Sequence, residues 1–172
     1  MALKRMHRKI GRQQSQAAPL TRDVLDKLLL LCGNDTRGLR NKVLLLLGYE
    51  TMRRRSELCN FCFEDLIEAP KRGPAIRLVR SKADQEGASR LIPISKELFN
   101  VIQTWQDAAD ISGPILRYVD RHGKIGYCLN PGSVGLIINS LYKNCVNRDL
   151  AQVFFGQSFR VGAALDLFEA GA

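Results

Sequence analysis

The sequence predicts a mainly α-helical α+β domain, in which a bundle of helices carries one small inserted antiparallel sheet. Apolar residues recur at helical spacing over most of the chain, and residues 44–47 form an all-leucine run inside one of these periods. Residues 75–80 and 89–94 alternate as strands do. With 172 residues and 45% apolar content, the chain is long enough to close one core of its own.

The first half of the chain predicts three helices. Thr21 is a candidate cap for a helix over residues 22–32, which Gly33 and the following Asn then stop. A second helix over residues 36–51 is apolar around most of its surface, so we expect it at the centre of the domain. A short helix follows near residues 56–60.

The second half begins with the sheet and returns to helices. Turns at residues 71–73 and 85–87 flank the alternating segments. Ser95 begins a helix to about residue 109, whose buried face is predicted to hold Leu98, Val101 and Trp105. Residues 116–128 indicate a short hairpin or an irregular loop. Two further helices are predicted over residues 132–147 and 157–169.

The charge balance is basic, with 26 Lys and Arg against 17 Asp and Glu and a formal net charge of +9, which favours a polyanionic partner. Residues 1–19 are predicted to be a flexible basic linker or tail, and residues 20–172 the folded domain. The tail is either a solvated, disordered segment or an arm that lies along DNA phosphates. Both interpretations can be true, because such arms often become ordered when they bind. Its basic residues are Lys4, Arg5, Arg8, Lys9 and Arg12.

Five cysteines form an odd set, and residues 1–16 contain no apolar stretch of a secretory signal, so a reducing cytoplasm is the predicted compartment. The longest apolar runs are too short for a membrane span. Cys59 and Cys62 have zinc-like spacing but no second pair to match, which favours core packing over a metal site. No metal is predicted.

Two arginine clusters are the candidate chemistry. The first, at residues 53–55, comes at a helix junction after the apolar helix, where a guanidinium needs an anion. Glu57 can supply part of that charge internally, which is the structural alternative. The second is Arg160, in the first turn of a helix whose end amides can also face an anion. If the two clusters lie close together in the fold, their arginines would bind one phosphate between them.

These motifs resemble those of the tyrosine recombinases and phage integrases. The family carries its first Arg in an Arg-x-Ser-Glu-Leu pattern, and residues 54–58 read Arg-Arg-Ser-Glu-Leu. Cre-like members read Gly-His-Ser-x-Arg-Val-Gly-Ala-Ala around the second Arg, and residues 156–164 match this except that Gln157 replaces His. Lys82 stands where the family has a Lys on a β-hairpin between the two arginines. The resemblance covers roughly residues 20–172.

The resemblance implies the fold of the tyrosine recombinase catalytic core and a phosphoryl transfer on double-stranded DNA, in which a Tyr attacks the scissile phosphate without metal or cofactor. Arg54 and Arg160 would stabilise charge on the nonbridging oxygens. Lys82 would be the general acid, unless it is only a solvated hairpin charge. Glu57 would orient an arginine. The flanking Arg53 and Arg55 are predicted to contact DNA.

The chain departs from the family at two points. Gln157 can donate a hydrogen bond to a phosphate oxygen but cannot transfer a proton near pH 7. No Tyr follows Arg160, so the nucleophile is expected to be missing; the four tyrosines are Tyr49, Tyr118, Tyr127 and Tyr142. The chain is therefore predicted to be a catalytic domain truncated before its nucleophile and inactive alone. We expect Leu165, Leu167 and Phe168 to be exposed or covered by another copy.

Three functional hypotheses stay open at the level of sequence. The first is a DNA-binding fragment of a site-specific recombinase or integrase, such as the remnant of a mobile element, that keeps the phosphate pocket. The second is a noncatalytic DNA-binding or regulatory protein that keeps the fold and pairs with an intact recombinase. The third is a piece of a longer protein, whose nucleophile lies in residues outside this sequence or in a neighbouring subunit.

Overall fold

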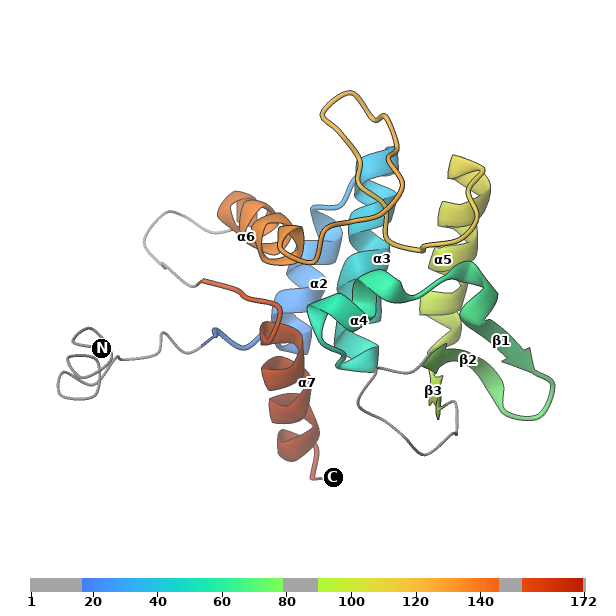
Figure 1. Cartoon of the computed structure of the whole chain (residues 1–172). Coiled ribbons are helices and arrows are strands. Elements are labelled where there is room, and N and C mark those ends of the chain that lie inside the picture. The colour runs from blue at the N-terminus through green and yellow to red at the C-terminus, as the bar shows by residue number, and fades with distance from the viewer. Residues whose placement is uncertain (1–16, 79–89, 146–152, 172) are drawn as a thin grey trace, which may run out of the picture.

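The computed structural model describes residues 17–78, 90–145 and 153–171 (Figure 1). Helices surround the central helix α3, and a single small sheet lies at one side. This architecture confirms the predicted α+β class. The elements in chain order are α2 (Arg22–Leu30), α3 (Thr36–Thr51), α4 (Arg55–Asn60), the 3-10 turn η1 (Phe63–Asp65), β1 (Leu66–Ala69), β2 (Gly73–Leu78), β3 (Arg90–Pro93), α5 (Lys96–Ala109), α6 (Ser133–Cys145) and α7 (Ser158–Glu169).

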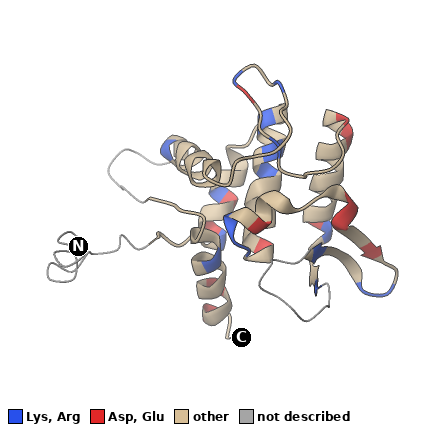
Figure 2. Ribbon diagram, in the orientation of Figure 1, with Lys and Arg blue, Asp and Glu red and all other residues tan. Residues whose placement is uncertain are grey.

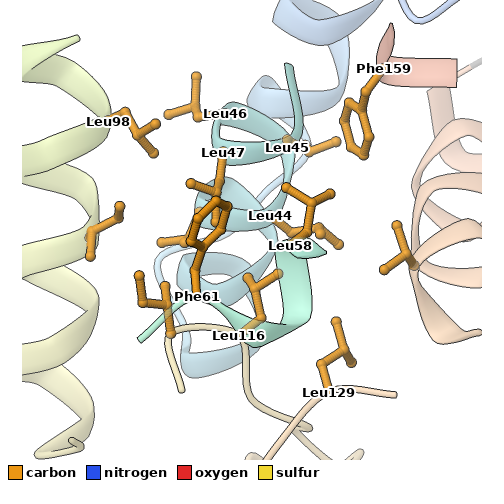
Figure 3. Packing of buried hydrophobic residues seen from close by; sticks show 14 of the residues in the cluster. Leu44, Leu45, Leu46, Leu47, Leu58, Phe61, Leu98, Leu116, Leu129 and Phe159 are labelled. Atoms are coloured by element: carbon orange, nitrogen blue, oxygen red, sulfur yellow. The ribbon is translucent and has the colours of Figure 1, made fainter. Parts of the chain in front are cut away.

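Helix α3 has the bounds and the central position that its sequence predicts. Its basic residues lie in the first two turns, at the end nearest the loop before α6 (Figure 2). Beyond them, residues 44–47 are all buried although they point to different sides of the helix. Figure 3 shows Leu46 toward Leu98 of α5 and Leu45 toward Phe159 of α7. Each fully buried leucine contributes roughly 1.5–3 kcal/mol, so α3 organises the core.

The sheet is antiparallel with the order β1-β2-β3. Ile76 of β2 pairs with Leu66 of β1 and with Ile92 of β3, and Ile76 is fully buried. The predicted turn at residues 71–73 joins β1 to β2. Strand β1 was not predicted, because its four residues are too few to show an alternating pattern. The second predicted turn, at residues 85–87, lies outside the described residues.

The start of α2 differs from the sequence-based expectation. Thr21 does occupy the N-cap position, but its side chain makes no capping hydrogen bond. The backbone N–H of Arg22 instead donates to Asp166 Oδ2 of α7 at 2.7 Å. The cap therefore comes from a residue far along the chain, which a local capping rule cannot find.

The remaining helices begin and end close to their predicted limits. Ser95 caps α5 by accepting the Leu98 N–H at 3.0 Å, and Leu98 and Trp105 are buried as expected, while Val101 is half-buried. Residues 116–128 form an irregular loop with an isolated bridge between Val119 and Ile125. Within the described ranges, no helix is long and apolar enough to cross a membrane.

The segment that enters the domain lies along the start of α7. The Ala18 N–H donates to the Val153 carbonyl, and the Leu20 N–H donates to the Ser158 carbonyl at 3.0 Å. Leu20 is fully buried, and its backbone crosses Gly162 so closely that a Cβ there would lie 1.9 Å from the Leu20 carbonyl oxygen. This contact holds the start of α7 against the entering segment and so helps to position the second arginine cluster.

Candidate functional site

The first arginine cluster lies in the corner between α3 and α4. Met52 ends α3 in the left-handed conformation, with φ of 50°, and its N–H donates to the Gly48 carbonyl. The chain then becomes extended at Arg54, which is the N-cap residue of α4. Arg53 is half-buried and its Nε donates to the Thr51 carbonyl at 3.0 Å. Arg54 and Arg55 are exposed.

Glu57 holds the backbone of this corner. Its Oε2 accepts the backbone N–H of Arg54 at 2.9 Å, which closes the first turn of α4. In the part of the chain that the structure describes, the one salt bridge joins Arg22 to Asp26. Glu57 therefore binds the Arg54 main chain and does not form an ion pair with its guanidinium. The alternative interpretation, in which Glu57 neutralises the arginine cluster internally, lacks this ion pair.

The second arginine cluster lies at the start of α7. Ser158 is fully buried, and its Oγ accepts the Phe155 N–H at 2.9 Å, which fixes the turn before the helix. Phe159 is buried as well. Gln157, the N-cap residue of α7, and Arg160 are exposed. The partial positive charge of the helix N-terminus adds to that of Arg160.

Two close contacts bring the clusters side by side. A Cβ on Gly156 would lie 3.0 Å from Cβ of Arg55, so the Arg55 side chain packs on the turn that leads into α7. A Cβ on Gly48 would lie 2.6 Å from the ring of Phe159, which lets α7 approach α3 (Figure 1). Sequence reasoning included Gly156 only as a letter of the second motif and missed Gly48, although a Gly inside an apolar helix is itself a signal of close packing.

The corner is electropositive and open to solvent. Arg54, Arg55 and Arg160 are exposed, and no Asp or Glu oxygen of the described residues lies within 4.0 Å of their guanidinium groups. Unpaired exposed guanidinium groups on neighbouring elements can bind an anion in common, and they are well matched to phosphate.

Several candidate residues lie outside the described ranges, namely Lys82 of the proposed hairpin and the tail residues Lys4, Arg5, Arg8, Lys9 and Arg12. Cys59 is buried in the core, as the sequence predicts.

The tyrosines take separate places in the fold. Tyr142 is buried with its ring edge-to-face against Phe154, at 4.8 Å between centroids. The hydroxyl of Tyr49 donates to Asp166, and burial together with this carboxylate raises the pKa of Tyr49 to about 12. Both match the core or helix-face position predicted for them. Tyr118 and Tyr127 are exposed in the loop before α6.

The profile of the phage integrase family matches residues 19–172, nearly the whole chain. The chain belongs to the phage integrase family. This agrees with the two arginine motifs at residues 54–58 and 156–164. A comparison with curated protein sequences finds no match.

Solved structures of tyrosine recombinases have the same fold. XerA recombinase matches with a TM-score of 0.67 and 16% identity over 94% of this chain and 52% of its own. XerH bound to its difH substrate matches with a TM-score of 0.62 and 14% identity, and the match covers 92% of this chain and 45% of XerH. A λ integrase dimer bound to a COC′ core site matches with a TM-score of 0.60 and 14% identity, and the match covers 95% of this chain and 48% of λ integrase. The chain thus spans about half the length of these proteins.

Proposed function

We propose that this chain binds double-stranded DNA through the corner formed by α3, α4 and the start of α7, as the phosphate-recognising part of a site-specific recombinase or integrase. We further propose that its 172 residues keep the pocket for the scissile phosphate but do not supply the tyrosine nucleophile, so that the chain alone does not cleave DNA. The observation that supports the proposal is the packing of Arg55 on Gly156, which brings the start of α4 into contact with the turn before α7.

The chemistry follows from the charge of the transition state. When a phosphodiester is attacked, negative charge spreads over its nonbridging oxygens, and fixed cationic donors stabilise this state more than the ground state. Arg54 and Arg160 would supply these donors, and Gln157 would add one neutral amide hydrogen bond. Lys82 would protonate the departing 5′-oxygen. Arg53 and Arg55 would contact neighbouring phosphates.

Removal of either central arginine tests the DNA-binding half of the proposal. We expect Arg54→Ala and Arg160→Ala each to weaken binding to a DNA duplex by about 1–3 kcal/mol, the value of a charge-assisted contact. Fluorescence anisotropy at fixed salt measures this. Lys124→Ala is the charge-matched control, because Lys124 is exposed in the loop at the opposite end of α3 and does not line the cavity there. Unchanged binding in both test variants would show that these arginines are structural.

A nicked suicide substrate tests the catalytic half. In this family's chemistry, cleavage beside a nick releases the short strand, so the enzyme stays linked to the DNA through its tyrosine. We expect denaturing gels to show no covalent adduct with this chain, although it binds the same DNA in the anisotropy assay. An adduct would show that a residue of this chain is the nucleophile, and peptide mapping would identify it.

The outer face of α7 supports a second candidate function, that of a noncatalytic regulator that pairs with another recombinase chain or with itself. Val161, Leu165 and Phe168 follow one another at helical spacing and are all exposed, as is Leu167. This exposure agrees with the sequence-based expectation, and such apolar stripes are typical of association surfaces. Sedimentation velocity of the wild type and of Leu165→Asp/Phe168→Asp tests it, because a monomeric wild type would exclude self-pairing.

A further inference from the structure

A second cationic site lies at the other end of α3. A cavity of about 760 Å³ opens between the start of α3, the end of α2, the loop before α6 and α6 itself. This volume is typical of small-molecule sites, which measure roughly 300–1,000 Å³. The cavity is separate from the DNA-binding corner, because none of Arg54, Gln157 and Arg160 lines it. Its polar wall includes Arg37, Arg40 and Arg121.

Arg40 is the unusual residue of this cavity. Only 4% of it is exposed, yet no carboxylate of the described residues forms an ion pair with it. Its Nε donates to Asn41 Oδ1 at 2.9 Å, and its Nη1 donates to the Arg117 carbonyl at 3.0 Å. Both acceptors are neutral. Burial, and next the neighbouring charge of Arg37, lower the pKa of Arg40 to about 10, so its surroundings do not compensate the positive charge.

The Nη2 nitrogen is the free edge of the Arg40 guanidinium, because it donates to no group of the described residues. Among these residues, no fully buried side-chain nitrogen is left without a partner, so Nη2 keeps some contact with solvent. Arg40 lines the cavity, and a ligand bound there could accept a hydrogen bond from this nitrogen. A buried, oriented guanidinium with a free edge matches an anionic group.

Each of the two carboxylates on the cavity wall accepts backbone N–H groups through one of its oxygens, and neither forms an ion pair with Arg40. Asp35 Oδ1 accepts the Gly38 N–H at 3.1 Å and caps α3. Asp120 Oδ1 accepts the N–H groups of His122 and Lys124 at 2.8 and 2.9 Å and holds the loop. They shape the site and leave the free edge of Arg40 without a counter-ion.

The rest of the lining is mixed. Leu31, Val119, Leu129 and Ile137 supply apolar surface, and Asn41, Ser133, Ser140 and Asn144 supply amide and hydroxyl groups. A ligand that fits this pattern carries one anionic group on a compact, largely apolar body. The positive end of the 16-residue helix α3 lies at the same wall and favours the same charge.

We propose that this cavity binds a small organic anion, a carboxylate or a phosphate ester on an apolar body, with the free edge of Arg40 and the side chain of Arg37 holding the anionic group. Three probes with the same ring separate the contributions. Benzoate and phenyl phosphate carry the two head groups, and benzamide is the neutral counterpart of benzoate.

The experiment is an NMR titration of the ¹⁵N-labelled full chain at constant ionic strength. We expect at least one of the two anions to give saturating shifts at Arg40 Nε–H and at the amides of residues 36–38 and 120–122. The anion that saturates identifies the head group. Phenyl phosphate can also shift residues 157–160 at the DNA-binding corner, and these separate signals keep the two proposals distinguishable.

Variants complete the test. Arg37→Gln should weaken the binding roughly three- to tenfold, as expected for one partly screened charged contact. Arg77→Gln removes the same charge from an exposed position on β2 and should leave binding unchanged. Arg40→Lys, with its fold checked by the amide spectrum, should weaken binding further because it loses the planar fork. Saturation by benzamide equal to that by benzoate, shifts that never saturate with either anion, or binding insensitive to Arg37→Gln would each overturn the proposal.

Discussion

Asp166 joins three helices through one carboxylate oxygen. Its Oδ2 accepts the Arg22 N–H at the start of α2 and the hydroxyl of Tyr49 on α3, at 2.7 and 2.6 Å, while Asp166 itself lies on α7. An anion that accepts two donors at this distance makes stronger hydrogen bonds than a neutral acceptor does. The network therefore holds α7, and Arg160 with it, against the central helix.

The Tyr49 hydroxyl should contribute a pH-dependent part of the stability. Because burial and Asp166 raise its pKa from 10.0 to about 12, the folded protein keeps a proton that the unfolded chain loses first. The contribution is thus fully present below pH 10 and is lost as the pH rises toward 12. We expect Tyr49→Phe to lower the free energy of unfolding by about 1 kcal/mol at neutral pH.

Urea denaturation of the wild type and Tyr49→Phe measures this difference across pH. The difference in the free energy of unfolding between the two proteins should become smaller as the pH rises from 10 to 12. Tyr118→Phe is the control, because Tyr118 is exposed and should show no gap at any pH. A gap for Tyr49→Phe that stays constant through this range would mean that the hydroxyl is not held by Asp166.

At the scale of elements, the position of α7 depends on the absence of a side chain at Gly162. Helix propensity alone predicts that Gly162→Ala stabilises the protein by about 1 kcal/mol. The fold predicts the opposite, because the new Cβ would overlap the Leu20 carbonyl oxygen, and backbone cannot move aside as a flexible side chain does. We expect Gly162→Ala to lower the free energy of unfolding by roughly 1–3 kcal/mol or more, as at other overpacked positions.

Thermal or urea unfolding of two variants decides between these expectations. Ala164→Gly lies on the exposed side of the same helix and should cost about 1 kcal/mol through propensity alone. Gly162→Ala should be the less stable of the two and should also weaken DNA binding, because α7 carries Arg160. A Gly162→Ala protein as stable as the wild type would contradict the described crossing of residue 20 over α7.

The elements that sequence predicted well are those whose signal is local. Residues 36–51 have their leucine run and their limits in one continuous stretch, and α5 has Ser95 at its start. The failures have non-local causes. Strand β1 exists because β2 pairs with it, and the cap of α2 comes from Asp166 in α7 instead of Thr21. No window of neighbouring residues contains either partner.

At the scale of the whole molecule, the two motifs at residues 54–58 and 156–164 were found from sequence because they resemble a family pattern. The close approach of the two segments could be seen only in the fold, since it depends on the packing at Gly48 and Gly156. The cavity around Arg40 could not be predicted, because a helix pattern does not say whether an arginine is buried. Arg37 and Arg40 are indistinguishable by type, yet one is half-buried and the other 4% exposed.

The net charge of +9 gives the last prediction, which concerns how the chain attracts DNA as a whole. Each phosphate that a Lys or Arg neutralises releases a counterion, and the slope of log K against log salt changes by about 0.9 for each contact. If the basic tail lies along DNA, replacing Lys4, Arg5, Arg8, Lys9 and Arg12 with Gln should make the slope shallower by about 2 to 4.5.

Anisotropy titrations of one duplex at several salt concentrations measure the slope. The control replaces Lys124 and Lys143 with Gln; these exposed residues belong neither to the proposed DNA-binding corner nor to the cavity lining, and their replacement should leave the slope unchanged. The tail variant should still respond to Arg160→Ala, because the corner is proposed to bind a phosphate independently of the tail. An unchanged slope in the tail variant would instead indicate a solvated tail and would leave the corner as the chain's whole contact with DNA.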